Sequence, residues 1–276
     1  MTATTMQETE VRPQGKPESF VSADGTRLAG VQYGSGAPLV LVHGSGADRN
    51  RWTGVTAALA RELAVHTYDR RGRGDSQDGP SYSLEREAED LLALLHGIGA
   101  PADVVAHSYG ALCALSAAAM DSRLLRRLVL YEAPLPPQVG LDDAIVQRLS
   151  GLLRDGDCEG LVAAFFLEVL HVSAKQLAAL KQTPQWAARV AEASTIPREL
   201  AAQNAFSLDP TRFRALKSPV TLLLGGASPP PFRAAAERLA RDLPQARVTV
   251  LPGQAHGAMD SAPDLFVATV LDLLKC

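Results

Sequence analysis

The chain has 276 residues, of which 46% are hydrophobic and 21% are charged, so it can bury a large core as one α/β domain with an insertion or as two small domains. Its 27 Lys and Arg against 30 Asp and Glu give a formal net charge of −3, which excludes a broad basic surface for nucleic acid or an anionic membrane. We therefore expect neither partner.

The N-terminal segment is polar. Residues 1–18 lack the apolar run of a secretory signal, and no run in the chain approaches the length of a membrane span, so we expect 1–18 to be a flexible tail. The cysteines at 113, 158 and 276 are odd in number and widely spaced, which argues against a disulfide framework or a structural zinc site. These features predict a cytoplasmic protein in a reducing compartment.

Strand and helix patterns alternate along the rest of the chain. Residues 19–34 are expected to form a hairpin with Asp24 and Gly25 at its turn. Apolar runs then predict strands over 38–42, 63–68, 102–106, 125–131, 219–224 and 247–251. Helical patterns predict helices over 51–61, 83–98, 109–121, 231–241 and 263–274. This order is typical of an α/β fold with a mostly parallel, doubly wound sheet.

The alternation is interrupted once. Residues 134–212 contain no convincing strand and consist of Ala- and Leu-rich helical stretches. We expect this segment to be a helical cap over the carboxyl edge of the sheet, where ligands bind in open α/β sheets. The core would then comprise residues 19–133 and 213–276.

A strand-turn-helix pattern surrounds Ser108 in the stretch "AHSYGA". A tight turn here would force Ser108 into a strained conformation that exposes its hydroxyl, which requires small residues two positions before and after it. Those residues are Ala106 and Gly110. The pattern is a nucleophile elbow with alanine at its first position.

Four segments in this order carry a family resemblance: "LVLVHGSGADRNRW", "YDRRGRGDS", "AHSYGA" and "VLPGQAHGAMD". On them the chain, from about Phe20 to its end, resembles the α/β-hydrolase superfamily. The resemblance implies that Ser108 is a nucleophile and that His256, in a Gly-rich loop after the last strand, is its base. It also implies that the backbone amides of Ser45 and Tyr109 form an oxyanion hole.

The remaining histidines have less specific surroundings. His43 is expected to support its turn and His107 to point into the structure, while His66, His96 and His171 are interpreted as strand, helix and cap residues. The stretch "GSGADR" does not fit a dinucleotide-binding motif, because arginine stands where the third glycine is required. The "RGD" in the second segment is not expected to be an adhesion motif.

The third member of a catalytic triad departs from the commonest pattern. Most members of the superfamily carry an aspartate after the penultimate strand, but "LLLGGASPPPF" holds no carboxylate and Ser228 occupies the approximate place. Glu132, at the end of the preceding strand, is in an alternative acid position and is our candidate. The alternative is that Glu132 has a structural role, in which it closes the entrance to the cap or pairs with an arginine. Asp260 is a lesser rival.

We expect a serine hydrolase without cofactor or metal that cleaves an ester, thioester, lactone or amide of a small to medium apolar molecule. Phe165, Phe166 and Trp186 are candidates to line its pocket, although such residues at helical spacing are more often core. Two alternatives remain open. One is an acyl-eliminating or carbon–carbon lyase, or an acyltransferase, with the same triad. The other is a hydrolase-fold ligand-binding protein without turnover.

Overall fold

The structure is a computed structural model that describes residues 14–243 and 245–275. These residues form one eight-stranded sheet with the strand order β1-β2-β4-β3-β5-β6-β7-β8. Its strands are β1 (Lys16–Val21), β2 (Arg27–Tyr33), β3 (Ala37–Val42), β4 (Leu63–Tyr68), β5 (Ala102–His107), β6 (Leu125–Tyr131), β7 (Val220–Gly225) and β8 (Ala246–Leu251). The β1–β2 and β2–β4 pairs are antiparallel and the others are parallel, which confirms the expected fold class.

The first strand begins earlier than the sequence suggests. Lys16 pairs with Gln32 and Glu18 pairs with Gly30, so the expected tail of residues 1–18 is too long, and its residues 1–13 lie outside the described part of the chain. The strand β1 lies at the sheet edge and most of its residues are exposed, so its polar residues resemble a tail. Backbone hydrogen bonds, which leave little trace in composition, hold it in place.

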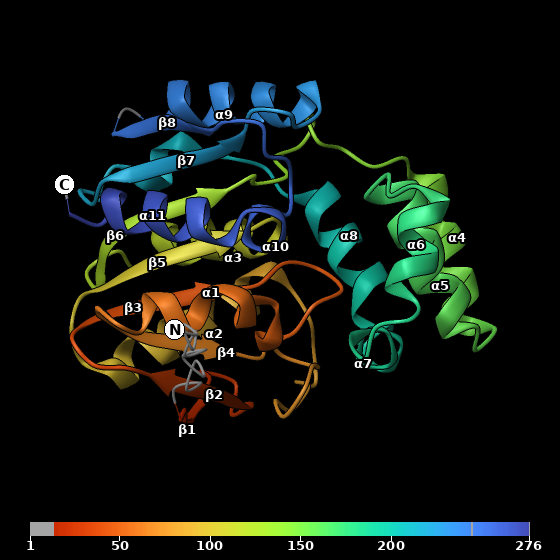
Figure 1. Ribbon diagram of the computed structural model, residues 1–276, viewed down its shortest axis with the longest axis horizontal. Helices are drawn as coiled ribbons and strands as arrows, with labels where there is room; N and C mark the ends of the chain where they lie inside the picture. The colour runs from red at the N-terminus through yellow and green to blue at the C-terminus, as the bar shows by residue number, and fades with distance from the viewer. Residues whose placement is uncertain (1–13, 244, 276) are drawn as a thin grey trace, which may run out of the picture.

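Helices cover both faces of the sheet (Figure 1). They are η1 (Arg49–Trp52), α1 (Thr53–Leu59), α2 (Leu84–Ile98), α3 (Tyr109–Met120), α9 (Pro230–Asp242), α10 (Ala258–Ser261) and α11 (Pro263–Leu273). Leu39, Leu41 and Val105 pack with the residues of α1, α10 and α11, whereas their strand neighbours Val40 and Val104 pack with those of α2, α3 and α9. This alternation follows from the two-residue repeat of a strand. The predicted helices agree with the observed ones, except that the expected helix over 51–61 is divided into η1 and α1 and that the short α10 was not predicted.

Residues 134–212, which we call the helical insertion, contain no strand among their described residues. Its helices are α4 (Asp143–Arg154), α5 (Cys158–Ala164), η2 (Phe165–Val169), α6 (Ala174–Leu180), α7 (Gln185–Ala191) and α8 (Thr195–Ala205), and η3 (Pro210–Phe213) leads back to the sheet. Most of these helices share a separate hydrophobic cluster that includes Leu149, Leu161 and Ile196. Leu208 and Phe213 instead pack in the core, so the chain returns to it a few residues before 212.

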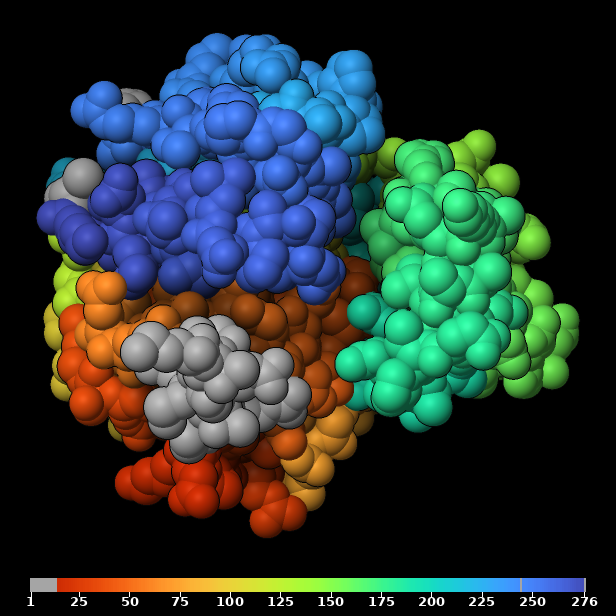
Figure 2. Space-filling model, viewed as in Figure 1, coloured from red at the N-terminus to blue at the C-terminus, as the bar shows by residue number. Residues whose placement is uncertain are grey.

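The insertion lies beside the sheet edge that carries the carboxyl ends of β5 to β7 (Figure 1). Figure 2 shows it as a separate lobe, with a groove along part of its border with the core. In the part of the chain that the structure describes, no helix combines the length and the apolar character that crossing a membrane requires.

Candidate active site

A cavity of about 650 Å³ lies between the carboxyl edge of the sheet and the helical insertion. Loops that follow β3, β5 and β8 contribute Ser45, Ser108 and His256 to its wall. The insertion contributes Phe165 and Phe166. The predicted nucleophile and the predicted base, which are far apart in the sequence, therefore face one cavity.

Ser108 has the backbone conformation that the elbow pattern predicts. Its φ of 54° and ψ of −127° are strained for a residue with a side chain, and it stands between β5 and the first residue of α3. A Cβ on Gly110 would lie 2.5 Å from the carbonyl oxygen of His43, and one on Gly44 would lie 2.9 Å from Cβ of Ser108. Glycine at both positions lets the start of α3 approach the loop after β3 closely.

The imidazole of His256 is bound to the carboxylate of Glu132. Its Nδ1 lies 2.6 Å from Oε2, within the hydrogen-bonding range that we expect. The carboxylate is almost fully buried. Because a carboxylate oxygen accepts hydrogen bonds, Nδ1 is the donor in this contact, and in a neutral ring Nε2 would be an acceptor. Oε1 accepts hydrogen bonds from the Gly225 amide, at 2.8 Å, and from the hydroxyl of Ser228.

The two competing positions for the acid have other contacts. Ser228, at the place where the usual aspartate would stand, donates to Glu132 and so helps to fix the carboxylate of the alternative position. Asp260 forms an ion pair with Arg51 at 2.5 Å, and its side chain is 62% exposed. The arginine pairing that we considered for Glu132 therefore belongs to Asp260.

Three side chains that the sequence analysis did not assign to the site hold the His256 loop. His107 donates from Nε2 to the carbonyl oxygen of His256 at 2.8 Å, and burial lowers its pKa, so its ring stays neutral. The Tyr131 hydroxyl binds the carbonyl of Ala255 and the amide of Ala258. The ring of Phe232 lies 5.0 Å from that of His256. Only the position of Tyr131 at a strand end could have indicated such a role.

The loop after β3 is held by its carbonyl groups. Nδ1 of His43 lies 2.9 Å from the Gly44 oxygen, and the same oxygen accepts from Arg70 at 3.1 Å. In a trans peptide the N–H points opposite to the C=O, so these bonds fix the direction of the Ser45 amide. Tyr109 is the first residue of α3, and its amide has no partner four residues back. Both predicted oxyanion donors are thus fixed backbone groups.

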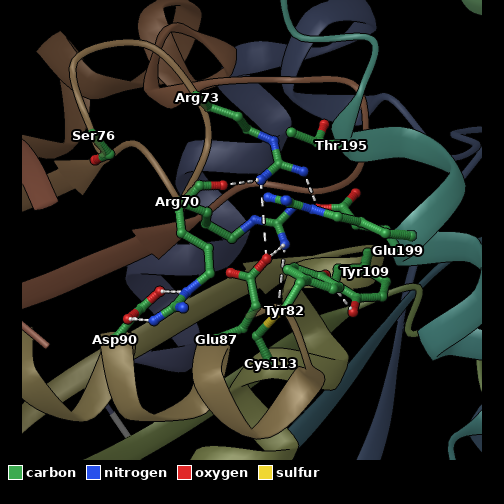
Figure 3. Close-up of polar contacts among 12 residues, drawn as sticks. Arg70, Arg73, Ser76, Tyr82, Glu87, Asp90, Tyr109, Cys113, Thr195 and Glu199 are labelled. Atoms are coloured by element: carbon green, nitrogen blue, oxygen red, sulfur yellow. Dashed lines mark hydrogen bonds and ion pairs between the residues drawn. The ribbon is translucent and has the colours of Figure 1, made fainter. Parts of the chain in front are cut away.

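A buried charge cluster lies behind this loop (Figure 3). Arg70 contacts Glu87 at 3.0 Å and Glu199 at 2.6 Å, and Arg73 also binds Glu199. All four side chains are fully buried, and two positive charges meet two negative ones. Burial alone would lower the pKa of Arg70, but the charges of Glu199 and Glu87 raise it above its usual value. Glu199 belongs to α8, so the cluster ties the insertion to the loop after β3.

The predicted pocket residues of the insertion divide into two groups. Phe165 and Phe166 line the cavity. The prediction for Trp186 is wrong, because this residue is only 8% exposed and is not among those that line the cavity. Its ring packs against Phe166, with the ring centroids 6.2 Å apart, and the ammonium group of Lys181 lies over it. Helical spacing showed that Trp186 is buried but not which neighbours bury it.

A serine on a strained turn, a carboxylate-bound imidazole and two fixed amides at one cavity suit nucleophilic attack on a carbonyl group. Among residues 14–243 and 245–275, no cluster of three or more His, Cys, Asp or Glu side chains is arranged to hold a metal ion.

Comparison with known proteins places these features in a family. A model described as "Alpha/beta hydrolase family" matches residues 39–269. An alpha/beta hydrolase from Sphaerobacter thermophilus has a solved structure with 34% identity and a TM-score of 0.83, covering 93% of this chain and 100% of that one. The "Putative carbamate hydrolase RutD" of Pseudomonas savastanoi pv. phaseolicola is 29% identical over 88% of this chain and 96% of its own. The "N-formylmaleamate deformylase" of Pseudomonas putida is 35% identical over 42% of this chain and 44% of its own.

Proposed function

The chain belongs to the alpha/beta hydrolase family, and we propose that it is a serine hydrolase whose catalytic triad is Ser108, His256 and Glu132. The observation that carries the proposal is the 2.6 Å contact between Nδ1 of His256 and the buried Glu132, at a cavity that Ser108 also lines. A serine hydroxyl is a weak nucleophile without a base, and a neutral imidazole held in one tautomer supplies that base.

In the proposed reaction, Oγ of Ser108 attacks the substrate carbonyl carbon and its proton passes to Nε2 of His256. Glu132 stays ionised and stabilises the resulting imidazolium through Nδ1. The amides of Ser45 and Tyr109 bind the oxyanion of the tetrahedral intermediate. That intermediate expels the alcohol, thiol or amine, which takes the proton from Nε2, and leaves an acyl-enzyme. Water, deprotonated by the same imidazole, then releases the acid and regenerates the serine.

We infer that the scissile bond is an acyl bond to oxygen, sulfur or nitrogen. The printed names of two relatives refer to a carbamate hydrolase and to a deformylase, and this supports cleavage next to a carbonyl. The insertion would serve as a cap that admits the substrate and limits access of water. Of the two alternatives, elimination or acyl transfer uses the same residues and is separated from hydrolysis by its products. Ligand binding without turnover would leave Ser108 unreactive.

The test combines a fluorophosphonate probe with a panel of p-nitrophenyl esters. We expect the probe to label the wild type and not Ser108→Ala, and turnover to fall by roughly 10⁶ in that variant. Glu132→Gln keeps the shape but offers an amide to Nδ1, so turnover should fall by roughly 10³ to 10⁴. Asp260→Asn is the matched control and should change turnover little. Hydrolysis in ¹⁸O-labelled water must place the label in the released acid.

An unlabelled wild type would favour the ligand-binding alternative, and a labelled protein whose acid product lacks solvent oxygen would favour elimination or transfer. Retention of a tenth of wild-type activity in Ser108→Ala would remove this serine from the mechanism. A loss in Asp260→Asn that matches the loss in Glu132→Gln would refute the assignment of the acid.

A further inference from the structure

One arginine at the cavity wall differs from the buried arginines of the core in its hydrogen-bond partner. Arg189, in α7 of the insertion, lines the cavity and is half-buried. It donates from Nη1 to the carbonyl oxygen of Gly46 and lies 5.2 Å from the ring centroid of Phe166. Across residues 14–243 and 245–275, no carboxylate lies within ion-pair distance of this guanidinium.

The buried arginines of the core are each neutralised. Arg70 and Arg73 share Glu87 and Glu199, and Arg71 binds Asp90. A charge taken out of water is costly unless an opposite charge compensates it, so partnered arginines are the rule in a protein interior. Burial and, to a lesser degree, the charge of Arg51 lower the pKa of the Arg189 guanidinium. The charges of Asp48, Asp260 and Glu192 act in the opposite direction but do not outweigh burial. Unlike the buried arginines of the core, Arg189 therefore has carboxylates in its surroundings but, among the described residues, none in direct contact.

The cavity as a whole carries an excess of positive charge. Arg51 also lines it and is close enough to Arg189 to weaken its charged form. Asp260 is the carboxylate among the lining residues, and it is already bound to Arg51. Among the side chains that line the cavity, two guanidinium groups thus face one carboxylate, and the nearby Asp48 and Glu192 do not line it. An anion that enters the cavity can reach Arg189 directly.

The position of Arg189 relates this charge to the reaction centre. Its partner Gly46 follows Ser45 directly in the loop of the proposed oxyanion hole. Arg189, Ser45 and Ser108 all line the same cavity, so an anion bound to Arg189 would share it with a carbonyl bound at the Ser45 amide. The apolar side chains of Phe165, Phe166 and Leu170 complete the wall around it.

We propose that Arg189 binds a carboxylate of the substrate, so that the preferred substrates are monoesters or monoamides of short dicarboxylic acids. The type of bond that is cleaved rests on the proposed function, whereas the binding of the anion by Arg189 does not. A planar guanidinium forms paired hydrogen bonds with a carboxylate, and a half-buried site strengthens them. The substrate would then be an ester or amide that carries a negatively charged carboxylate, in contrast to the apolar molecule that the sequence analysis predicts.

Two substrates of matched size test the specificity. p-Nitrophenyl hemisuccinate and p-nitrophenyl butyrate share a leaving group and differ in a terminal carboxylate. We expect the wild type to prefer the hemisuccinate in kcat/KM by about 100-fold, and Arg189→Gln to remove most of that preference. Arg189→Lys, which keeps the charge, should restore part of it. Arg154→Gln, on an exposed position of α4, is the matched control and should leave the preference unchanged.

The ratio of the two rates separates recognition from support of the loop. If Arg189→Gln lowers both rates equally, Arg189 only holds Gly46 and the proposal is wrong. A wild type that hydrolyses both esters without preference would also overturn it.

Binding gives a readout that does not depend on turnover. Ser108→Ala should bind monomethyl succinate in calorimetry, and the double variant with Arg189→Gln should lose that binding by about 100-fold. Binding of monomethyl succinate by Ser108→Ala together with a wild type that hydrolyses none of the esters would count against the proposed reaction alone. Hydrolysis of neutral esters by the wild type without binding of the anion would overturn this inference alone.

Discussion

Glu199→Gln tests whether the buried charge cluster stabilises the fold. The substitution keeps the volume of the side chain and removes its charge, so it creates no cavity. It leaves Arg70 and Arg73 with Glu87 as their remaining carboxylate, because Glu199 contacts both guanidinium groups. The cluster then changes from neutral to a net charge of one, without access to solvent.

Removing one partner of a buried ion pair typically costs about 3–5 kcal/mol, because the other charge remains buried without compensation. One kcal/mol shifts the Tm of a protein near this size by about 2–4 °C, so we expect Tm to fall by about 6–20 °C. The charge imbalance, and not a lost shape, is the cause. Arg73→Met in the Glu199→Gln background restores neutrality with Arg70 and Glu87, and should recover at least half of the loss.

Urea denaturation and thermal unfolding of the three proteins measure these differences. Asp78→Asn is the matched control, because it breaks the pair between Asp78 and Arg198 of the same helix α8 at a carboxylate that is 47% exposed. We expect it to cost less than about 1 kcal/mol. A Glu199→Gln protein within about 1 kcal/mol of the wild type would show that the cluster tolerates the imbalance. A double variant that is less stable than Glu199→Gln would show that charge balance is not the cause.

Three further outcomes are expected. Ser228→Ala removes one hydrogen bond to the proposed catalytic carboxylate and should lower kcat by about tenfold or more without unfolding the protein; an unchanged kcat would show that the hydroxyl is dispensable. Gly110→Ala should prevent correct folding, because the added Cβ would lie 2.5 Å from a backbone oxygen. The added Cβ of Gly97→Ala meets nothing within 4 Å, so this control should stabilise the protein slightly. Circular dichroism measures both effects. Burial lowers the pKa of His43 and His107 below their ordinary 6.5, so the unfolded chain binds protons below that pH and the folded one does not. The free energy of unfolding should therefore fall by about 1.4 kcal/mol per pH unit for each histidine as the pH drops below about 6.5, and His43→Gln should show a shallower slope in urea denaturation at pH 7, 6 and 5.

Local patterns in the sequence determined the layout of the core. The two-residue repeat of the strands and their alternation with helices predicted β3 to β8 within one residue at each end. The small residues around Ser108 predicted its strained turn, since that requirement involves only neighbouring positions. The missing carboxylate after β7 directed attention to Glu132, which indeed contacts His256.

Only the tertiary structure decided which distant side chains meet. Arg70 and Glu199 are 129 residues apart, and their contact depends on how the insertion packs on the sheet edge. Helical periodicity shows which face of α7 is buried, but the packing of the insertion decides that Trp186 faces its core and Arg189 faces the cavity. The sequence pattern fixes how much of a helix is apolar, whereas the partner surface that covers it is formed by residues far away in the chain.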